Sequence, residues 1–359
     1  MNVTARKPGA SEDLRGFEWR YLWGLSRPGE LLILPNSGAS ARFSPDGRIL
    51  ATGNYETGEV KLWDSASHTV LRSFNAYEGD CWWLAFSPDG QTLATSSRNI
   101  RDFKLWDVAT GNQIGTLIGS TQENFSVSLS PDGKRVATIA GTAYKDVPAE
   151  IKIWDLAAQK QLGSFPGLTS WGTRVEFSPT DDTLVTGDGQ GLVKLWNWNS
   201  GTVRILRGHN GMVFEVRFSP DGKLLATGDL NGTIILWDWA TGSMARVLTG
   251  HQGPIYGLAI SRDGHWLASA SRDHTARLWN VRTGEELARF PGHSGGSGAL
   301  SFLPTGKHWS PRARTGRCAF GKSVQNARAR YSHAPVVVIR SVIRLTAASY
   351  LSMNGTVTE

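Results

Sequence analysis

The sequence predicts an all-β fold in which one four-stranded antiparallel sheet is repeated around a ring. Two short markers recur with the same period through most of the 359 residues. The first is a Trp-Asp or Trp-Asn pair, at Trp63, Trp106, Trp154, Trp196, Trp237 and Trp279. The second is Phe-Ser-Pro-Asp-Gly or a variant, about twenty residues earlier, beginning at Phe43, Phe86, Leu129, Phe177, Phe218 and Ile260. Self-similarity with this period indicates one supersecondary unit copied many times.

The sixth unit shows the expected elements of one copy. Short apolar segments separated by Asp, Gly and Ser predict strands over Pro254–Ile260, His265–Ala270, Thr275–Trp279 and Glu285–Phe290. A single sheet of this kind cannot cover both of its faces, whereas a ring of sheets stacked face to face can. The third unit carries a longer excursion at 140–149, on the rim formed by the turns between second and third strands.

Three segments are expected along the chain. Residues 1–29 form a lead-in, with an amphipathic helix over 11–25 that Ser11 caps. Residues 30–306 hold the repeats. Residues 307–359 form a basic tail in which the register of the seventh unit is lost, as in a shifted reading frame or a degenerate terminus, or a genuine basic appendage.

Charge is distributed unevenly. The formal net charge is +7, yet the tail contains nine basic residues and one acid, so residues 1–306 hold 29 basic and 30 acidic residues. A nucleic-acid-binding function would therefore depend on the tail, and nucleic acid is an unlikely partner of the repeats. Cys81 and Cys318 are too few for a disulfide framework, which suits a reducing compartment. We expect a cytoplasmic protein without a membrane segment or signal peptide.

The Gly-His, Ser-Pro-Asp-Gly and Trp-Asp markers resemble those of WD-repeat β-propellers over roughly residues 30–305. This resemblance implies six full four-stranded blades plus an incomplete seventh, with the strand at Leu31–Leu34 closing the ring. The segment 14–23 also resembles the lead-in to the propeller half of large bacterial, planctomycete-type Ser/Thr protein kinases. The chain would then be the non-catalytic part of such a protein.

The resemblance also implies a buried hydrogen-bond tetrad in the sixth unit. Its members are His251, Ser271 (or Ser269), Asp273 and Trp279. The fifth unit keeps His209 and Trp237 but has Asn231 at the acidic position, and the fourth has Gln190 there. The first three units lack the Gly-His pair, so we expect tryptophan and aliphatic packing to hold them.

Motifs for catalysis and for cofactors are missing from the sequence. It has no phosphate-binding glycine motif, kinase catalytic segment, His-x-x-x-His or Cys-x-x-Cys pair. We therefore expect neither enzymatic activity, a cofactor nor a metal. First-strand residues read as mostly apolar or small, which argues against a cation site in the central channel.

We expect this fold to function through a binding surface. In WD-repeat proteins the loops before first strands, and between second and third strands, commonly bind partners. Here those positions hold aromatic, Met and charged residues, which are typical of interface hot spots. They are Asp80, Trp82, Glu123, Phe125, Trp171, Met212, Phe214, Leu230, Tyr256 and Arg272. Packing of Trp82 and Phe214 between blades is the alternative for those two.

Three classes of function follow. The favoured one is a non-enzymatic scaffold that binds a protein or peptide on the propeller rim. The second is a nucleic-acid binder that uses the tail. The third is a small-molecule or metal-dependent hydrolytic propeller.

Overall fold

The structure, a computed structural model, describes the greater part of the chain as strands and turns. The described residues are 32–35, 40–54, 56–98, 100–118, 123–141, 149–165, 168, 172–261, 263–291, 297–302, 309–313 and 317–320. The expected helix over 11–25 and most of the basic tail lie outside these ranges. Within them there is no helix of the length and apolarity needed to cross a membrane.

Six four-stranded antiparallel sheets, the blades, follow one another along the chain. Blade 1 holds β2 (Ser40–Phe43), β3 (Ile49–Gly53), β4 (Glu59–Asp64) and β5 (Val70–Asn75). Blade 2 holds β6 (Trp83–Phe86), β7 (Thr92–Ser96), β8 (Phe103–Asp107) and β9 (Gln113–Leu117). Blade 3 holds β10 (Glu123–Leu129), β11 (Arg135–Gly141), β12 (Glu150–Asp155) and β13 (Lys160–Phe165).

The second half of the ring repeats the pattern. Blade 4 holds β14 (Gly172–Phe177), β15 (Thr183–Asp188), β16 (Leu192–Asn197) and β17 (Val203–Arg207). Blade 5 holds β18 (Val213–Phe218), β19 (Leu224–Asp229), β20 (Ile234–Asp238) and β21 (Met244–Leu248). Blade 6 holds β22 (Ile255–Ile260), β23 (Trp266–Ser271), β24 (Thr275–Asn280) and β25 (Glu286–Pro291). These last four strands match the ranges predicted from the sequence to within one or two residues.

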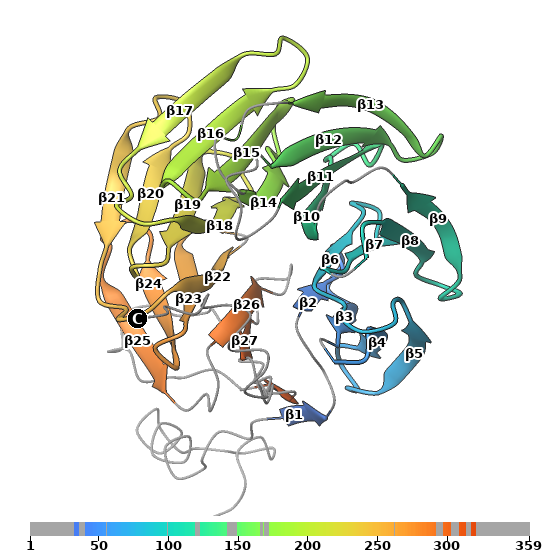
Figure 1. Ribbon diagram of the computed structural model, residues 1–359. Helices are drawn as coiled ribbons and strands as arrows, with labels where there is room; N and C mark the ends of the chain where they lie inside the picture. The colour runs from blue at the N-terminus through green and yellow to red at the C-terminus, as the bar shows by residue number, and fades with distance from the viewer. Residues whose placement is uncertain are drawn as a thin grey trace, which may run out of the picture.

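The blades are arranged around a central axis, with the first strand of each on the inside and the fourth on the outside (Figure 1). Successive first strands contact one another, as β10, β14, β18 and β22 do in order. The chain is thus an all-β, six-bladed propeller. The core lies between blades, where the buried aliphatic residues and tryptophans of one sheet pack against the next.

Two further sheets of two strands lie between blade 6 and blade 1. One pairs β26 (Ser297–Phe302) with β27 (Trp309–Ala313), and the other pairs β1 (Leu32–Pro35) with β28 (Arg317–Phe320). Strand β26 contacts both β22 and β2, and β27 contacts β28. The sequence pattern ended the repeats at residue 306. Strands β27 and β28 lie beyond that boundary. They lack the Trp-Asp signature, and they form because they pair with β26 and β1.

The repeated Ser-Pro-Asp-Gly turns connect first and second strands. In blade 1, the Ser44 hydroxyl donates to Asp46 Oδ1 (2.6 Å) and accepts from the backbone N–H of Ile49 (3.0 Å). Gly47 adopts a left-handed backbone (φ 74°), which glycine takes without a steric penalty. The turn therefore satisfies its own polar groups, and the same residues recur because each blade needs the same reversal.

Candidate partner-binding rim and central channel

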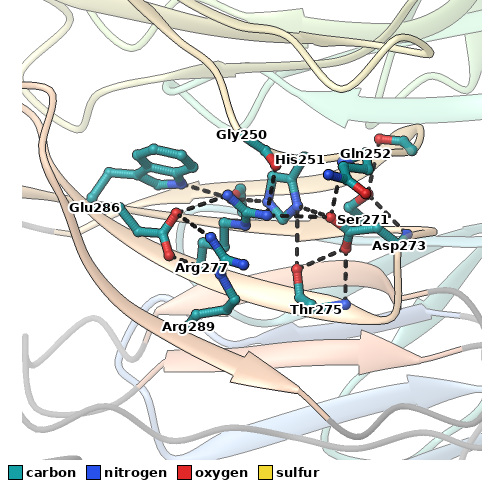
Figure 2. A network of polar contacts seen from close by, with 12 residues as sticks. Gly250, His251, Gln252, Ser271, Asp273, Thr275, Arg277, Glu286 and Arg289 are labelled. Atoms are coloured by element: carbon teal, nitrogen blue, oxygen red, sulfur yellow. Dashed lines mark hydrogen bonds and ion pairs between the residues drawn. The ribbon is translucent and has the colours of Figure 1, made fainter.

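A continuous polar network crosses blade 6 from the loop before β22 to β24 (Figure 2). His251 Nδ1 lies 2.8 Å from Asp273 Oδ2, and His251 Nε2 lies 2.7 Å from the hydroxyl of Ser269. That hydroxyl also accepts the indole N–H of Trp279 at 2.8 Å. The serine of this tetrad is therefore Ser269 rather than Ser271.

Ser271, two residues after Ser269 on β23, makes different hydrogen bonds. Its hydroxyl donates to the carbonyl of Gly253 at 2.8 Å and accepts the backbone N–H of Asp273 at 3.1 Å. It thereby ties the β23–β24 turn to the loop before β22. The register explains the difference, because Trp279 pairs with Leu267, which makes Ser269 its diagonal neighbour and leaves Ser271 out of reach.

Blade 5 contains a complete tetrad that the sequence pattern did not predict. His209 Nδ1 lies 2.8 Å from Asp229 Oδ2, and His209 Nε2 lies 2.7 Å from Thr227 Oγ1. The indole of Trp237 donates to the same threonine at 2.8 Å. The carboxylate is supplied by Asp229, two residues before Asn231, so the polar chain is intact. The prediction of a degraded fifth unit is wrong because it looked for the acid only at the turn position.

All six blades keep one element of this network. In each, the indole N–H of the marker tryptophan on the third strand donates to a hydroxyl on the second strand, at 2.8 to 3.0 Å. The hydroxyls belong to Thr52, Thr95, Thr138, Thr186, Thr227 and Ser269. Blades 1 to 3 therefore add a buried polar bond to the expected packing.

The rim residues of blades 5 and 6 project from a repeated β-bulge. Pairing of β18 with β19 skips Phe214, and pairing of β22 with β23 skips Tyr256. The same shift skips Phe125 in blade 3 and Thr173 in blade 4. A bulge leaves one residue out of the ladder and re-aims its side chain. Four successive blades thus present one extra residue at the entry of the first strand.

Phe214 and Tyr256 contact each other across the boundary between blades 5 and 6. Their ring centroids are 4.9 Å apart in an edge-to-face arrangement, and both side chains are half-buried. Met212 and Leu230 are also half-buried and are joined by a backbone hydrogen bond of 3.0 Å between Leu230 N and Met212 O. Arg272 is exposed on the equivalent turn of blade 6, where its N–H donates to the carbonyl of Pro254.

Of the remaining predicted rim residues, the structure describes the side chains of Asp80 and Trp82. Asp80 is 3% exposed and accepts hydrogen bonds from the hydroxyl of Ser97 (2.5 Å) and the N–H of Arg98 (3.3 Å), so it braces a loop and presents no charge to a partner. Trp82 is half-buried and packs against the core cluster of blades 2 and 3, as the alternative interpretation held. Trp171 and the side chains of Glu123 and Phe125 lie outside the described residues.

The central channel is filled by charged side chains around one tryptophan. Trp83 of blade 2 is 3% exposed, and its ring lies 4.0 Å from the guanidinium carbon of Arg42 and 3.5 Å from that of Arg174. Arg42 belongs to blade 1 and Arg174 to blade 4. Side chains from these blades can meet only across the axis, which places this contact in the channel.

Ion pairs between the first strands of blades 4 and 5 also lie in the channel. Arg174 pairs with Glu215, and Arg217 lies 2.7 Å from Glu176 and 3.1 Å from Glu215. Burial raises the pKa of Glu176. Burial lowers the pKa of Arg174 to about 10, which keeps Arg174 charged at neutral pH, and the Glu176 and Glu215 carboxylates outweigh burial and raise the pKa of Arg217. The expectation of a mostly apolar or small channel is confirmed for blade 2, whose first strand reads Trp-Leu-Ala-Phe, and is wrong for blades 1, 4 and 5, which supply the charged side chains.

Comparison with known families gives one match. The family described as WD domain, G-beta repeat, matches residues 37–64, 68–107, 160–197, 200–238 and 242–280, just over half of the chain. The protein belongs to the WD40 family. A search of curated proteins returned no match. The resemblance of segment 14–23 to kinase-linked propellers therefore stays a prediction, and that segment lies outside the described residues.

In blade 6 the WD40 propeller contains an arrangement that looks catalytic, and the tetrad of blade 5 has the same geometry with Thr227 in place of the serine. Ser269, His251 and Asp273 are joined as a nucleophile, base and orienting acid would be. The Ser269 side chain is fully buried, however, and its oxygen already accepts from Trp279. A substrate cannot reach it, so the three residues have a structural role. Among the described residues no three His, Cys, Asp or Glu side chains are placed to hold a metal.

The channel charges and the bulges are not among the features predicted from the sequence, although the sequence carries one signal of the charges. Arg42, Glu176 and Arg217 each stand one residue before the Phe of the second marker, and Trp83, Arg174 and Glu215 stand three residues before it. Aligning the units on that Phe shows charged or aromatic residues at these two alternate positions in three first strands each, where the other units have Ala, Ser or Gly.

The blade 6 tetrad predicts a loss of stability in mild acid. Burial lowers the pKa of His251 below its usual 6.5, and its hydrogen bond to Asp273 offsets only part of this effect. The unfolded chain therefore binds a proton that the folded state rejects. Stability is fully present above pH 6.5 and falls as pH drops toward the folded pKa, by up to about 1.4 kcal/mol per pH unit.

Urea unfolding of the wild type and of His251→Gln between pH 8 and pH 5 measures this effect. We expect the variant to be less stable at pH 8 and to show a flatter pH dependence. His265→Gln, which changes a histidine with a 71% exposed side chain, serves as the control and keeps the wild-type slope. Parallel pH profiles for all three proteins would contradict the assignment.

Proposed function

We propose that this protein is a non-enzymatic scaffold that binds a protein or peptide partner on the rim of its WD40 propeller. The observation that supports this most is the repeated bulge, which sets Phe214 and Tyr256 side by side at the entry of adjacent first strands. Together with Met212, Leu230 and Arg272 they form what we call the rim patch. Large aromatic and Met side chains with an Arg beside them are the residues that dominate binding energy at interfaces.

The partner best suited to the rim patch is an extended peptide with an apolar anchor. The Phe214 and Tyr256 rings are only half-buried, so a partner side chain can cover their remaining apolar surface. The bulge recurs in blades 3 to 6, and in each of these sheets it disrupts the hydrogen-bond ladder between the first and second strands. Presentation of side chains to a ligand is a reason to keep it.

Three further proposals concern the closure of the ring, the cellular location and an association with a kinase. We propose that the two sheets β26–β27 and β1–β28 together act as a seventh blade that closes the ring, because they occupy the space between β22 and β2. We also propose cytoplasmic residence, on the grounds of cysteine usage, since Cys81 and Cys318 are too few for a disulfide framework. Association with a kinase remains part of the proposal only through the resemblance of residues 14–23.

Peptides selected from a displayed library against the wild-type protein test the rim. The dissociation constant of a selected peptide is measured by fluorescence anisotropy for the wild type and for the double variant Phe214→Ala/Tyr256→Ala. Loss of two hot-spot side chains is expected to weaken binding at least about 30-fold, which corresponds to about 2 kcal/mol.

The matched control is Ile114→Ala/Leu162→Ala. It removes two side chains that are 49% and 50% exposed on the outer strands of blades 2 and 3. Binding by this control should equal that of the wild type. If the rim variant binds every selected peptide as tightly as the control does, the rim patch is not the binding surface.

A further inference from the structure

The channel contains one guanidinium group more than its carboxylates neutralise. Among the described residues, three arginines and two glutamates meet there, which leaves one positive charge in excess. Arg174 and Arg217 each form an ion pair with a carboxylate. Arg42 does not: its hydrogen bond runs from Nη1 to the carbonyl oxygen of the neighbouring Ala41 (3.0 Å). The surplus charge is therefore that of Arg42.

The surroundings of Arg42 do not satisfy it. Its Nη2 atom is buried without a hydrogen-bond partner. Burial and the charges of Arg217 and Arg174 hold the pKa of Arg42 well below its usual value, and the charges of Glu215 and Glu176, which form no ion pair with Arg42, offset only part of this effect. A buried cation without a paired counter-charge is among the more unfavourable features that a folded protein can carry. A chain that retains such a group needs a negative charge beside it.

Further polar atoms without partners lie in the same first strands. They include the hydroxyls of Ser40, on the strand of Arg42, and of Ser126, on blade 3, as well as Nε of Arg174. Each can donate a hydrogen bond. Counting Arg42 Nη2, four donor atoms without an acceptor therefore lie on first strands among the described residues, whereas Glu215 Oε1, which has no hydrogen bond either, forms an ion pair with Arg217.

We propose that the central channel of this propeller binds a small oxyanion at the Arg42 guanidinium group. Guanidinium presents a planar fork of N–H donors that matches the two-oxygen edge of a phosphate or carboxylate. Water could accept the same hydrogen bonds, but it would leave the excess charge in place. The ring of Trp83, stacked on Arg42, closes the other side of the guanidinium group. This site is separate from the rim patch, so the inference does not depend on the proposed partner.

Phosphate-dependent stability tests the site. The folding equilibrium constant of the full-length protein is measured by urea unfolding at increasing inorganic phosphate, with ionic strength held constant by sodium bromide, whose anion is monatomic and has no two-oxygen edge. A ligand that binds only the folded state shifts this constant in proportion to its concentration above the dissociation constant. We expect about a tenfold rise in the folding constant for each tenfold rise in phosphate in that range.

Two variants make the result specific. Arg42→Met keeps the apolar stem and removes the surplus charge, so it should lose the phosphate response. Arg48→Met makes the same substitution and the same change of net charge in the same blade, at a side chain that is 86% exposed. It should respond as the wild type does. General salt effects on burial act on all three proteins alike and cancel in the comparison.

Three results would overturn the proposal. The first is a wild type that does not respond to phosphate, which would mean that water alone fills the channel. The second is an equal response in Arg42→Met, which would place the anion elsewhere. The third is an equal response to chloride, which would remove the oxyanion assignment. The wild-type phosphate and chloride titrations decide the matter even if Arg42→Met does not fold.

Discussion

Replacing Glu215 with glutamine is expected to lower the free energy of unfolding by about 3–5 kcal/mol. Glu215 is 1% exposed and pairs with both Arg174 and Arg217 in the channel. Removing its charge leaves Arg174, itself 3% exposed, as an uncompensated buried cation, and breaking one partner of a buried pair has an effect of this size. Urea unfolding at pH 7 measures it.

Glu59→Gln is the matched control for this prediction. Glu59 also pairs with a cation, Lys61 at 3.1 Å, but both side chains are partly solvated on blade 1. An ion pair that water can reach contributes about 0–1 kcal/mol, so the same substitution should change the free energy of unfolding little there. Similar losses at both positions would mean that the Glu215 ion pairs are as hydrated as surface ones, and their description as buried ion pairs would be wrong.

Replacing Ser269 with alanine is expected to destabilise the protein by about 2–4 kcal/mol. Its hydroxyl is the shared partner of His251 Nε2 and of the Trp279 indole N–H. Both partners are buried, with 6% of His251 and 2% of Trp279 exposed, so the substitution leaves two polar groups without a partner and without water. Each such group costs about 1–3 kcal/mol, and the neighbouring Asp273–His251 bond would weaken with them.

Ser271→Ala in the same strand provides the comparison. Its hydroxyl bonds to the backbone of Gly253 and Asp273, which lie in partly exposed turns where water can replace the serine. We expect a loss of about 1 kcal/mol, close to that of a single hydrogen bond. Chemical unfolding of the two variants side by side decides the point. A larger loss for Ser271→Ala would restore the tetrad suggested by sequence spacing alone.

The strands of each blade could be predicted from sequence because their signals are local. The turn markers satisfy their own polar groups, as Ser44 and Asp46 do, and alternating apolar residues define which face is buried. These features need no information from distant residues. The six-fold repetition then limits the packing to stacked sheets, because one sheet leaves a face uncovered.

The polar chemistry of the site could be predicted less well because it depends on register. Ser269 and Ser271 lie on the same face of β23, and only the pairing of Leu267 with Trp279 shows which one reaches the indole. In blade 5 the carboxylate comes from Asp229 at the end of β19, and a search at the turn position missed it. Sequence spacing does not show a difference of two residues in strand register, but that difference decides whether a hydrogen bond can form.

The bulges at Phe214 and Tyr256 belong to the same class of feature. The sequence placed both residues at the entry of a first strand and predicted that they face the rim. Whether each pairs in the ladder or is skipped by it depends on the neighbouring strand. The resulting edge-to-face contact joins two blades and is a property of neither alone.

The period, the strands, the turns and the marker tryptophans of this propeller could all be predicted from the sequence, since they follow from residues within one unit. The tertiary structure alone decided which charges meet at the axis. Arg42, Arg174, Arg217, Glu176 and Glu215 stand on three strands that are far apart in the chain, and each strand taken singly looks like an ordinary inner strand. Their pairing follows from closure of the ring, because a buried charge is tolerated only where the fold brings another group to it.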